Sequence, residues 1–268
     1  NRIAQVIKIK EYSNKYKLKD KPKIGIIIVQ DVEERVKLFV EKYFLNSKLA
    51  DMADFRFFYF AKESVRRCIA CDLCPKTLGD DEVYRCIIRN KEDLFVKYHK
   101  EIIELDAILL GGYSPETYDN INSIYQAFME RTRYIRRSDY IFSNCLVAPL
   151  VFQEIGSRES LQTRILTSIV RHHTILHKPM IFHVQNKKLI HFRTSFDNLH
   201  NFIVKAAHFT AGRILYYSNE TSYSNYNPLG YTLKTERDRE PVNVQRRRDN
   251  IEKRRQKYRN MLKNRIQN

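Results

Sequence analysis

The chain has 268 residues, of which 43% are hydrophobic and 29% are charged, and its 48 Lys and Arg outnumber its 31 Asp and Glu. This length and apolar content are enough for one large globular domain with extensions. The formal net charge of +17 favours anionic partners, namely phosphate, nucleic acid, an acidic protein or an anionic membrane surface.

No apolar run approaches the roughly 18 residues that a membrane-spanning helix needs, so we expect a protein without a membrane span. Five cysteines are too few for a disulfide scaffold in a chain of this length. We therefore expect the protein to be cytoplasmic or to lie in another reducing intracellular compartment, such as an organelle.

The chain opens with a basic arm over residues 1–21, in which the alternating residues 6–10 predict either a short edge strand or a segment that wraps a neighbour. A continuous apolar run over 23–29 then predicts a strand that is buried on both faces, and segments rich in apolar or aromatic residues predict further strands over 54–60, 106–112, 140–152 and 179–184. Segments with one apolar face predict helices between them, over 32–46, 94–105, 122–135, 156–176 and 195–217. Asp31 and Glu34 make a capping box for the first of these helices.

Alternating strands and helices imply a parallel sheet with helices on both faces. The predicted fold class is α/β, a flavodoxin-like, doubly wound, five-stranded parallel sheet over residues 22–217, with a cysteine-rich insertion at 68–86. Residues 218–243 are polar and predict a linker, and residues 244–268 predict a basic helical extension.

The C-terminal extension is nearly free of apolar residues. From Glu236 to Asn268 there are twelve Lys or Arg against five Asp or Glu. We expect this helix to be solvated or bound to a partner, and not to join the core. RNA or another polyanion would be held through its phosphates by the basic triplets of the extension, which are Arg246, Arg247, Arg248, Lys253, Arg254 and Arg255.

Four cysteines gather in one stretch. Cys68, Cys71 and Cys74 recur at every third position, and Cys86 follows after eleven intervening residues. Thiolates at this spacing can occupy the corners of one [4Fe-4S] cluster. Zinc is an alternative metal, although separated pairs of ligands suit it better, and buried or redox-idle thiols are a third reading. Cys145, in an apolar run, is expected to be a small core residue.

Several other side chains of reactive types are more simply interpreted as having no catalytic or ligand-binding role. His172 and His173 lack the spacing of metal ligands and are expected on a solvated helix face, and His183 likewise carries no site. Tyr113 and Tyr118 either contact a ligand or are loop aromatics.

Three motifs together resemble the NADPH-dependent FMN reductase family of flavodoxin-like proteins, and in particular its iron-sulfur flavoprotein branch. The first is the cysteine stretch, whose last gap is longer than in that branch. The second is the loop 114–120 with Phe128-Met129-Glu130-Arg131, which is similar to the family's Ser-Pro-x-Tyr loop and Phe-x-Asp-Arg helix end. The third, residues 156–160, resembles a Gly-Gly-x-Glu segment.

The resemblance implies a [4Fe-4S] cluster on the four clustered cysteines, FMN beside it and NAD(P)H as the electron donor. It also implies a homo-oligomer, either a dimer or a tetramer. Both the cysteine stretch and the Ser-Pro loop follow strands, so we expect them to be neighbours at the carboxyl edge of the sheet. The implied FMN contacts are Ser114, Pro115, Glu116, Thr117, Tyr118, Asn120, Gly156 and Ser157.

One departure from the family is serious. The family places Ser, Thr, Asn and Gly after the first strand, where backbone amides hold the FMN phosphate. This chain has Gln30-Asp31-Val32-Glu33-Glu34 there, and three carboxylates would repel a dianion. Either basic residues from elsewhere bind the phosphate, or flavin binding has been lost.

Two functional hypotheses follow. The first is an iron-sulfur flavoprotein that acts in electron transfer with a redox partner protein, or as a flavin-dependent NAD(P)H oxidoreductase. The second is a non-catalytic, flavodoxin-like basic subunit of a larger assembly, such as one containing RNA, that has lost FMN. The cysteine and Ser-Pro motifs favour the first, whereas the acidic loop, the charge and the terminal extensions favour the second.

Overall fold

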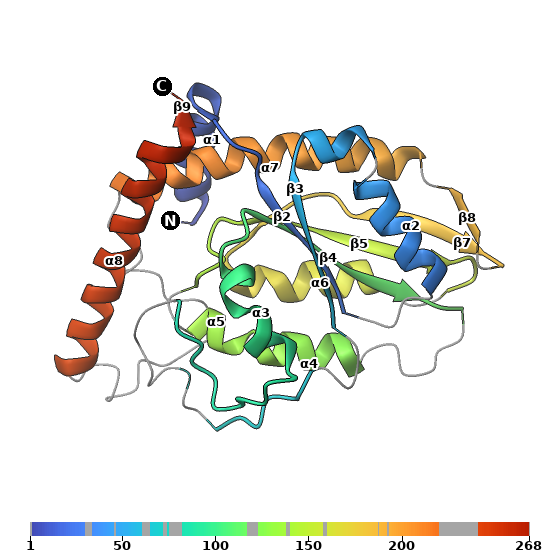
Figure 1. The fold of residues 1–268 in the computed structure, drawn as a ribbon, viewed down its shortest axis with the longest axis horizontal. Helices are drawn as coiled ribbons and strands as arrows, with labels where there is room; N and C mark the ends of the chain where they lie inside the picture. The colour runs from blue at the N-terminus through green and yellow to red at the C-terminus, as the bar shows by residue number, and fades with distance from the viewer. Residues whose placement is uncertain are drawn as a thin grey trace.

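The structure is a computed structural model, and it describes residues 2–29, 34–45, 47–60, 65–71, 74, 82–116, 123–137, 140–157, 160–186, 188–191, 193–219 and 241–267. It shows a mixed α/β fold in which helices surround a mostly parallel sheet (Figure 1). No helix among these residues is both long enough and apolar enough to cross a membrane.

The main path of the described sheet contains five parallel strands in the spatial order β3-β2-β4-β5-β7. Each contains or overlaps one predicted strand segment, and they are β2 (Lys23–Ile28), β3 (Asp54–Tyr59), β4 (Ala107–Ser114), β5 (Leu146–Glu154) and β7 (Met180–Gln185). A short strand, β6 (Ile175–Leu176), pairs with β5, and an antiparallel strand that was not predicted, β8 (Lys188–His191), pairs with β7.

The prediction over 140–152 places the start of this strand too early. Residues 140–145 form turns, in which Tyr140 and Asn144 adopt left-handed backbone conformations with φ of 58° and 61°. The strand begins only at Leu146, because such conformations cannot continue a β-ladder.

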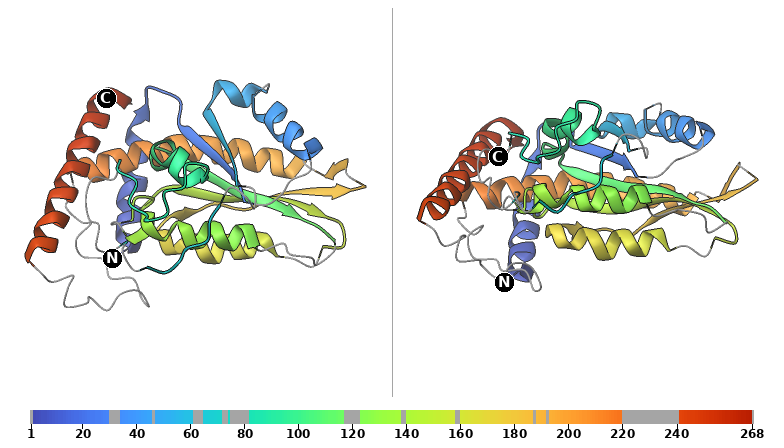
Figure 2. Two further views of the ribbon diagram at one scale, coloured as in Figure 1. Left: turned by 60° about the horizontal axis from the view of Figure 1, so that its bottom comes forward. Right: turned by 90° about the horizontal axis from the view of Figure 1, so that it is seen from below.

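Two apolar layers flank the sheet, since successive side chains of a strand point to opposite faces. Ile108 and Leu110 of β4 join the layer beneath α3 to α6, whereas Ala107 and Leu109 join the layer beneath α2 and α7. Figure 2 shows these helices around the sheet. The helices are α2 (Glu34–Leu45), α3 (Leu94–Ile103), α4 (Ser123–Arg131), α5 (Arg133–Arg137), α6 (Leu161–Ile169) and α7 (Arg193–Asn219), with 3-10 turns at Lys48–Asp51 and Val170–His172.

The N-terminal arm is a helix, α1 (Arg2–Lys15), so the edge strand predicted at residues 6–10 is wrong. The helix packs on α7 with Ile9 fully buried. A β-carbon at Gly212 of α7 would lie 2.2 Å from the carbonyl oxygen of Ile9. Glycine therefore permits the close approach of the two helices.

The C-terminal helix, α8 (Pro241–Arg265), packs against α7 at the end of the molecule where the strands begin (Figure 1). Its last residues form β9 (Ile266–Gln267), which pairs antiparallel with β1 (Lys17–Leu18) near the start of the chain. Ile251 and Ile266 are buried. The prediction that this helix is solvated or held only by a partner is therefore wrong.

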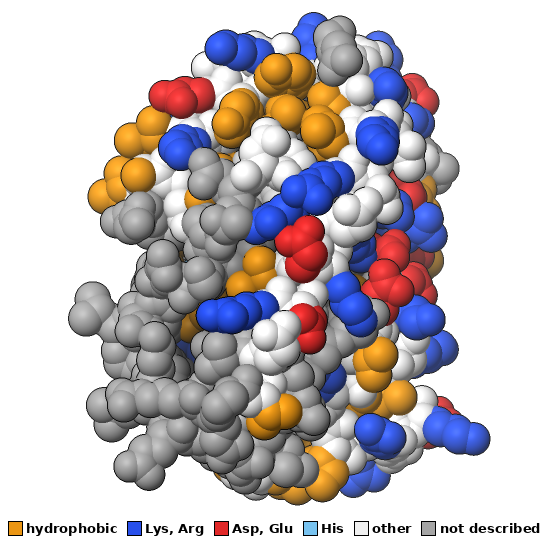
Figure 3. Space-filling model, turned by 90° about the vertical axis from the view of Figure 1, so that its left-hand side faces the viewer, with side chains coloured by type: hydrophobic (Ala, Val, Ile, Leu, Met, Phe, Trp, Pro, Cys, Tyr) orange, Lys and Arg blue, Asp and Glu red, His pale blue; other side chains and the backbone are white. Residues whose placement is uncertain are grey.

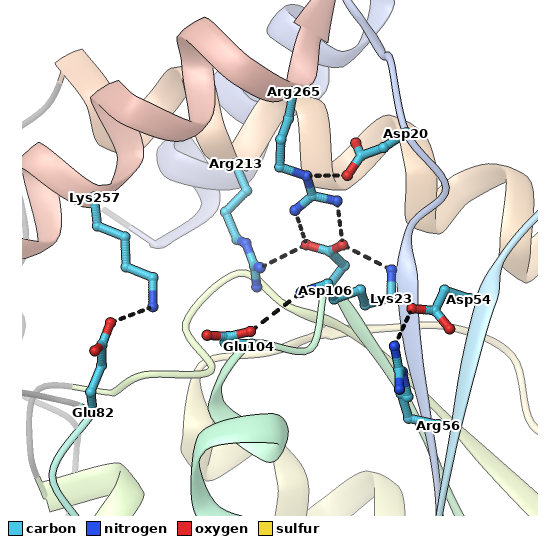
Figure 4. A network of polar contacts seen from close by, with 10 residues as sticks. All are labelled: Asp20, Lys23, Asp54, Arg56, Glu82, Glu104, Asp106, Arg213, Lys257 and Arg265. Carbon is cyan, nitrogen blue, oxygen red and sulfur yellow. Dashed lines mark hydrogen bonds and ion pairs between the residues drawn. The ribbon is translucent and has the colours of Figure 1, made fainter.

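Charge pairing explains how so polar a helix docks. The Arg265 guanidinium donates to both carboxylate oxygens of Asp106, at 3.0 and 2.8 Å, and to Asp20 at 2.7 Å (Figure 4). Asp106 also accepts from the backbone amide of Lys23 at 2.9 Å and lies 3.7 Å from Arg213. Because a carboxylate without a partner is costly to bury, Arg265 gives α8 a fixed place on the domain.

Candidate functional site

The carboxyl ends of β4 and β5 bring two predicted ligand segments together. In the parallel register, Ser114 lies opposite Gln153, so the Ser-Pro loop and the residues after β5 leave the sheet side by side. The hydroxyl oxygens of Ser114 and Ser157 are 2.9 Å apart. Ser114 is fully buried and Ser157 is half-buried.

Glu154 organises this edge of the sheet. Its carboxylate accepts a hydrogen bond from the Tyr113 hydroxyl and another, of 2.7 Å, from the backbone amide of Glu116. Gly156 follows with φ of 93°, and a β-carbon there would lie 2.9 Å from Oε1 of Glu116. The sequence analysis missed Glu154, although a carboxylate at the end of an apolar strand is a usable signal.

The strand order reverses between β2 and β4, because β3 lies on the other side of β2. Open α/β sheets bind ligands at such a reversal, outside the carboxyl ends of the strands. Ser114 ends β4 and therefore flanks this point. The loop after β2, with the predicted Asp31 cap, and the predicted contacts Thr117, Tyr118 and Asn120 lie outside the described residues.

A cation that the sequence analysis missed lies at the same edge. Nζ of Lys37, on α2, is 4.8 Å from the centre of the Tyr59 ring, and Tyr59 is the last residue of β3. The Tyr59 hydroxyl donates to Glu41 at 2.7 Å, which holds the ring against α2. Lys37 thus places positive charge near the carboxyl ends of β2 and β3, the two strands that come before the Ser114 loop in the chain.

The four clustered cysteines have two different surroundings. Cys68 and Cys71 are partly exposed, whereas Cys74 and Cys86 are buried among the apolar side chains beneath α3 to α6. Among the described residues, no group of three or more His, Cys, Asp or Glu is placed to hold a metal ion. In this arrangement the thiols do not fit a four-cysteine site. Residues 72, 73 and 75–81 lie outside the description, and the cluster stays a prediction.

A buried ion pair ties down both ends of the cysteine stretch. Arg131, at the end of α4, donates to the two carboxylate oxygens of Asp93 at 2.6 and 3.0 Å. It also donates to the Arg66 carbonyl at 2.8 Å and to the Tyr84 hydroxyl at 2.6 Å. Asp93 in turn accepts from the amides of Arg66 and Phe95, each at 3.0 Å.

Described residues before position 72 and after position 81 contact α4 and α8, respectively. Arg67 pairs with Glu130 of α4, and Glu82 lies 3.6 Å from Lys257 of α8 (Figure 4). Burial raises the pKa of the Tyr84 hydroxyl well above its usual value. The described cysteines therefore lie on the side of the sheet that α3 to α6 cover, with Cys68 near the ends of α4 and α6, and this position differs from the expected one beside the Ser114 loop.

The histidine predictions need correction, because His172 and His173 are both buried. The Thr132 hydroxyl donates to the Met129 carbonyl at 2.8 Å, so it accepts from Nε2 of His172 at 3.1 Å. Burial, followed by the charge of Arg136, lowers the pKa of His172 to about 3. His172 is thus a neutral core group, and His183 is half-buried in β7.

Cys145 is confirmed as a core residue. It is fully buried, and its thiol lies 3.2 Å from the Asp106 carbonyl oxygen as a hydrogen-bond donor. Burial raises the pKa of this thiol to about 11, so it is neutral at physiological pH.

The predicted phosphate-binding side chains of α8 differ in their exposure and pairing. Arg254 is buried, and Arg255 pairs with Glu252 at 2.8 Å. Arg248 and Lys253 are exposed, and the side chains of Arg246 and Arg247 lie outside the description. Figure 3 shows this end of the molecule, where basic and acidic side chains alternate. RNA binding stays a prediction.

The chain was compared with protein families, curated proteins and solved structures. No protein-family model matches the chain, and no curated protein matches it. Among solved structures, it is similar to the X-ray structure of an oxidoreductase from Corynebacterium diphtheriae, with a TM-score of 0.38 and 10% sequence identity, over 73% of this chain and 97% of that chain.

Proposed function

We propose that this chain is a flavodoxin-like protein that binds FMN at the carboxyl edge of its sheet and acts as an NAD(P)H-dependent oxidoreductase. The observation that carries the proposal is the contact between Ser114 and Ser157 beside the reversal of strand order. Numbered along the chain, the parallel strands follow the order 2-1-3-4-5. That order is the flavodoxin-like one, in which FMN binds at the reversal.

The described residues fit the ring portion of this cofactor. Gly156 and Ser157 offer backbone groups and a hydroxyl, which suit the neutral, hydrogen-bonding edge of an isoalloxazine ring, and the buried Ser114 positions Ser157 through their hydroxyl contact. Glu154 holds the two loops together through Tyr113 and Glu116 and leaves those groups in place. FMN, when bound, supplies acceptance of a hydride and release of single electrons. In this proposal the protein binds and orients the cofactor, and no side chain serves as a general base.

The phosphate needs a cation, because the loop after β2 carries three carboxylates. Lys37 is the residue that we assign to this role, since it lies at the carboxyl edge over Tyr59. The acidic loop would then be tolerated because a basic residue from α2 compensates it.

The test is a fluorescence-quenching titration of the purified chain with FMN and, in parallel, with riboflavin, which lacks the phosphate. We expect FMN to bind with a Kd of about 10 μM or below. Ser157→Tyr should fill the site and weaken both flavins at least about tenfold. Ser160→Tyr, at an exposed position three residues further along the chain, is the matched control and should change neither.

Lys37→Ala distinguishes binding of the FMN phosphate from binding of the flavin ring. It should weaken FMN about tenfold, as expected for loss of one charge-assisted contact, and leave riboflavin unchanged. Absence of saturable binding for both flavins would overturn the proposal and leave the non-catalytic basic subunit as the better account. An absorption spectrum of protein purified without oxygen, together with its iron content, tests the predicted cluster in the same preparation.

A further inference from the structure

A groove of about 550 Å³ lies between the cysteine stretch and α4 to α6. We call it the arginine groove, because four arginines line it. Arg67 comes from the cysteine stretch, Arg133 and Arg136 come from α5, and Arg171 comes from the 3-10 turn after α6. Cys68 lines the same groove.

The groove carries an excess of positive charge. Among its described lining residues, Glu130 is the one acid. Both carboxylate oxygens of Glu130 accept from Arg67, at 2.6 and 3.2 Å, and Gln126 donates to one of them at 3.2 Å. These hydrogen bonds, with that from Arg67 foremost, lower the pKa of Glu130. The acid therefore fixes the Arg67 wall of the groove, and the described lining holds four guanidinium groups and one carboxylate.

Packed elements present these cations. Arg136 is only 8% exposed, and its neighbours Tyr134 and Ile135 are 2% and 0% exposed in the core. The Arg131–Asp93 pair holds the opposite wall by binding the backbone of Arg66. A site whose walls are held before a ligand arrives loses less entropy on binding.

We infer that the arginine groove binds a small molecule that carries a diphosphate group. Guanidinium groups present planar forks of donors that match phosphate oxygens two at a time. The volume lies within the range of roughly 300 to 1,000 Å³ that small-molecule sites occupy, and Met129 and Ala70 add apolar lining for an organic portion. The groove lies on the helical face and not at the sheet edge, so this inference does not depend on FMN binding.

Isothermal titration calorimetry of the full chain with inorganic pyrophosphate tests the inference. We expect saturable binding with one site per chain, at least about tenfold tighter than orthophosphate, because two phosphates engage more of the forks. Arg133→Ala and Arg171→Ala should each weaken pyrophosphate about tenfold. Arg248→Ala, an exposed arginine on α8, is the matched control and should leave binding unchanged.

Glu130→Gln should change the affinity for pyrophosphate in the direction opposite to the arginine substitutions. Removing the one acid should tighten pyrophosphate about threefold or more, a result that a misfolded variant would not produce. Circular dichroism melts check that each variant folds.

Three outcomes would overturn the inference. These are the absence of saturable heat with pyrophosphate, affinity that is insensitive to Arg133→Ala and Arg171→Ala together, and equal affinity for orthophosphate. If pyrophosphate fails to bind and gel filtration shows self-association that Arg171→Ala abolishes, the groove is instead a contact between copies of the chain.

Discussion

Arg131 and Asp93 form an ion pair in which both side chains are 0% exposed. Burying two charges is costly, and the attraction between them offsets that cost only when further hydrogen bonds satisfy the remaining groups. Here the Arg66 carbonyl, the Tyr84 hydroxyl and two backbone amides provide those bonds. The pair therefore holds Arg66 and Tyr84, which flank the part of the cysteine stretch outside the description, in place.

Asp93→Asn should destabilise the protein by about 3 to 5 kcal/mol, because it leaves the Arg131 guanidinium buried without its anion. Urea denaturation followed by circular dichroism measures the change. Asp54→Asn breaks the exposed pair with Arg56 by the same substitution and should cost less than about 1 kcal/mol. Equal losses in the two variants would show that the buried pair has no special role.

His172 makes stability depend on pH in a defined direction. Its pKa in the folded protein is about 3, against 6.5 for the unfolded chain, so only the unfolded state takes up a proton between these values. The stabilisation is complete above pH 6.5 and is lost as the pH falls towards 3, by up to about 1.4 kcal/mol per pH unit.

His172→Gln should flatten the fall in unfolding free energy below pH 6.5, because glutamine does not titrate and its amide can still donate to Thr132. Denaturation midpoints across the acidic range provide the measurement. Some slope should persist from His177, whose pKa is also lowered by burial. Parallel curves for the wild type and the variant would contradict the assignment.

At the scale of elements, α8 packs along α7, and its last turn carries the contact with the buried Asp106. Arg265 is the contact that reaches the buried Asp106, while other basic residues of the helix pair with acids on the surface. The docking of α8 should therefore depend on one arginine much more than on the charge of the helix as a whole.

Arg265→Gln should cost about 2 kcal/mol, the scale of hydrogen bonds to a charged group, since Arg213 and the Lys23 amide still face Asp106. Arg259→Gln, which breaks an exposed contact with Glu252 on the same helix, should cost less than about 1 kcal/mol. Thermal or urea unfolding distinguishes the two. A cost for Arg259→Gln that matches that for Arg265→Gln would show that overall helix charge, and not the Asp106 contact, decides docking.

For the whole molecule, the parts that could be predicted are those whose cause is local in sequence. The apolar run 23–29 predicts a strand buried on both faces, and β2 is such a strand. The contact of Ser114 with Ser157 follows once two parallel strands are neighbours, because their carboxyl ends then meet. Strand runs and their order therefore account for much of the sheet and for half of the candidate site.

The rest depends on contacts between residues that are far apart in sequence, and no local sequence pattern predicts these contacts. Residues 6–10 alternate like a strand, yet they form a helix because Gly212 lets the backbone at Ile9 approach α7. The polar helix α8 packs on α7 and places Arg265 on the buried Asp106, a contact between residues 159 positions apart. The spacing of the cysteines shows that four thiols are close in sequence, but it does not determine whether the loops between them bring the sulfurs together.

The pairing of β1 with β9 has a consequence for biosynthesis. The ribosome makes α1 and β1 before the sheet, whereas the helix and strand that complete their surroundings, α8 and β9, are made after it. At roughly 5 to 20 residues per second, the chain from His191 to Gln267 takes roughly 4 to 15 s to make. During that interval the finished sheet holds Asp106 without Arg265, and the nascent domain lacks its final closing contact. Premature release of the chain would leave the buried carboxylate without its chief partner.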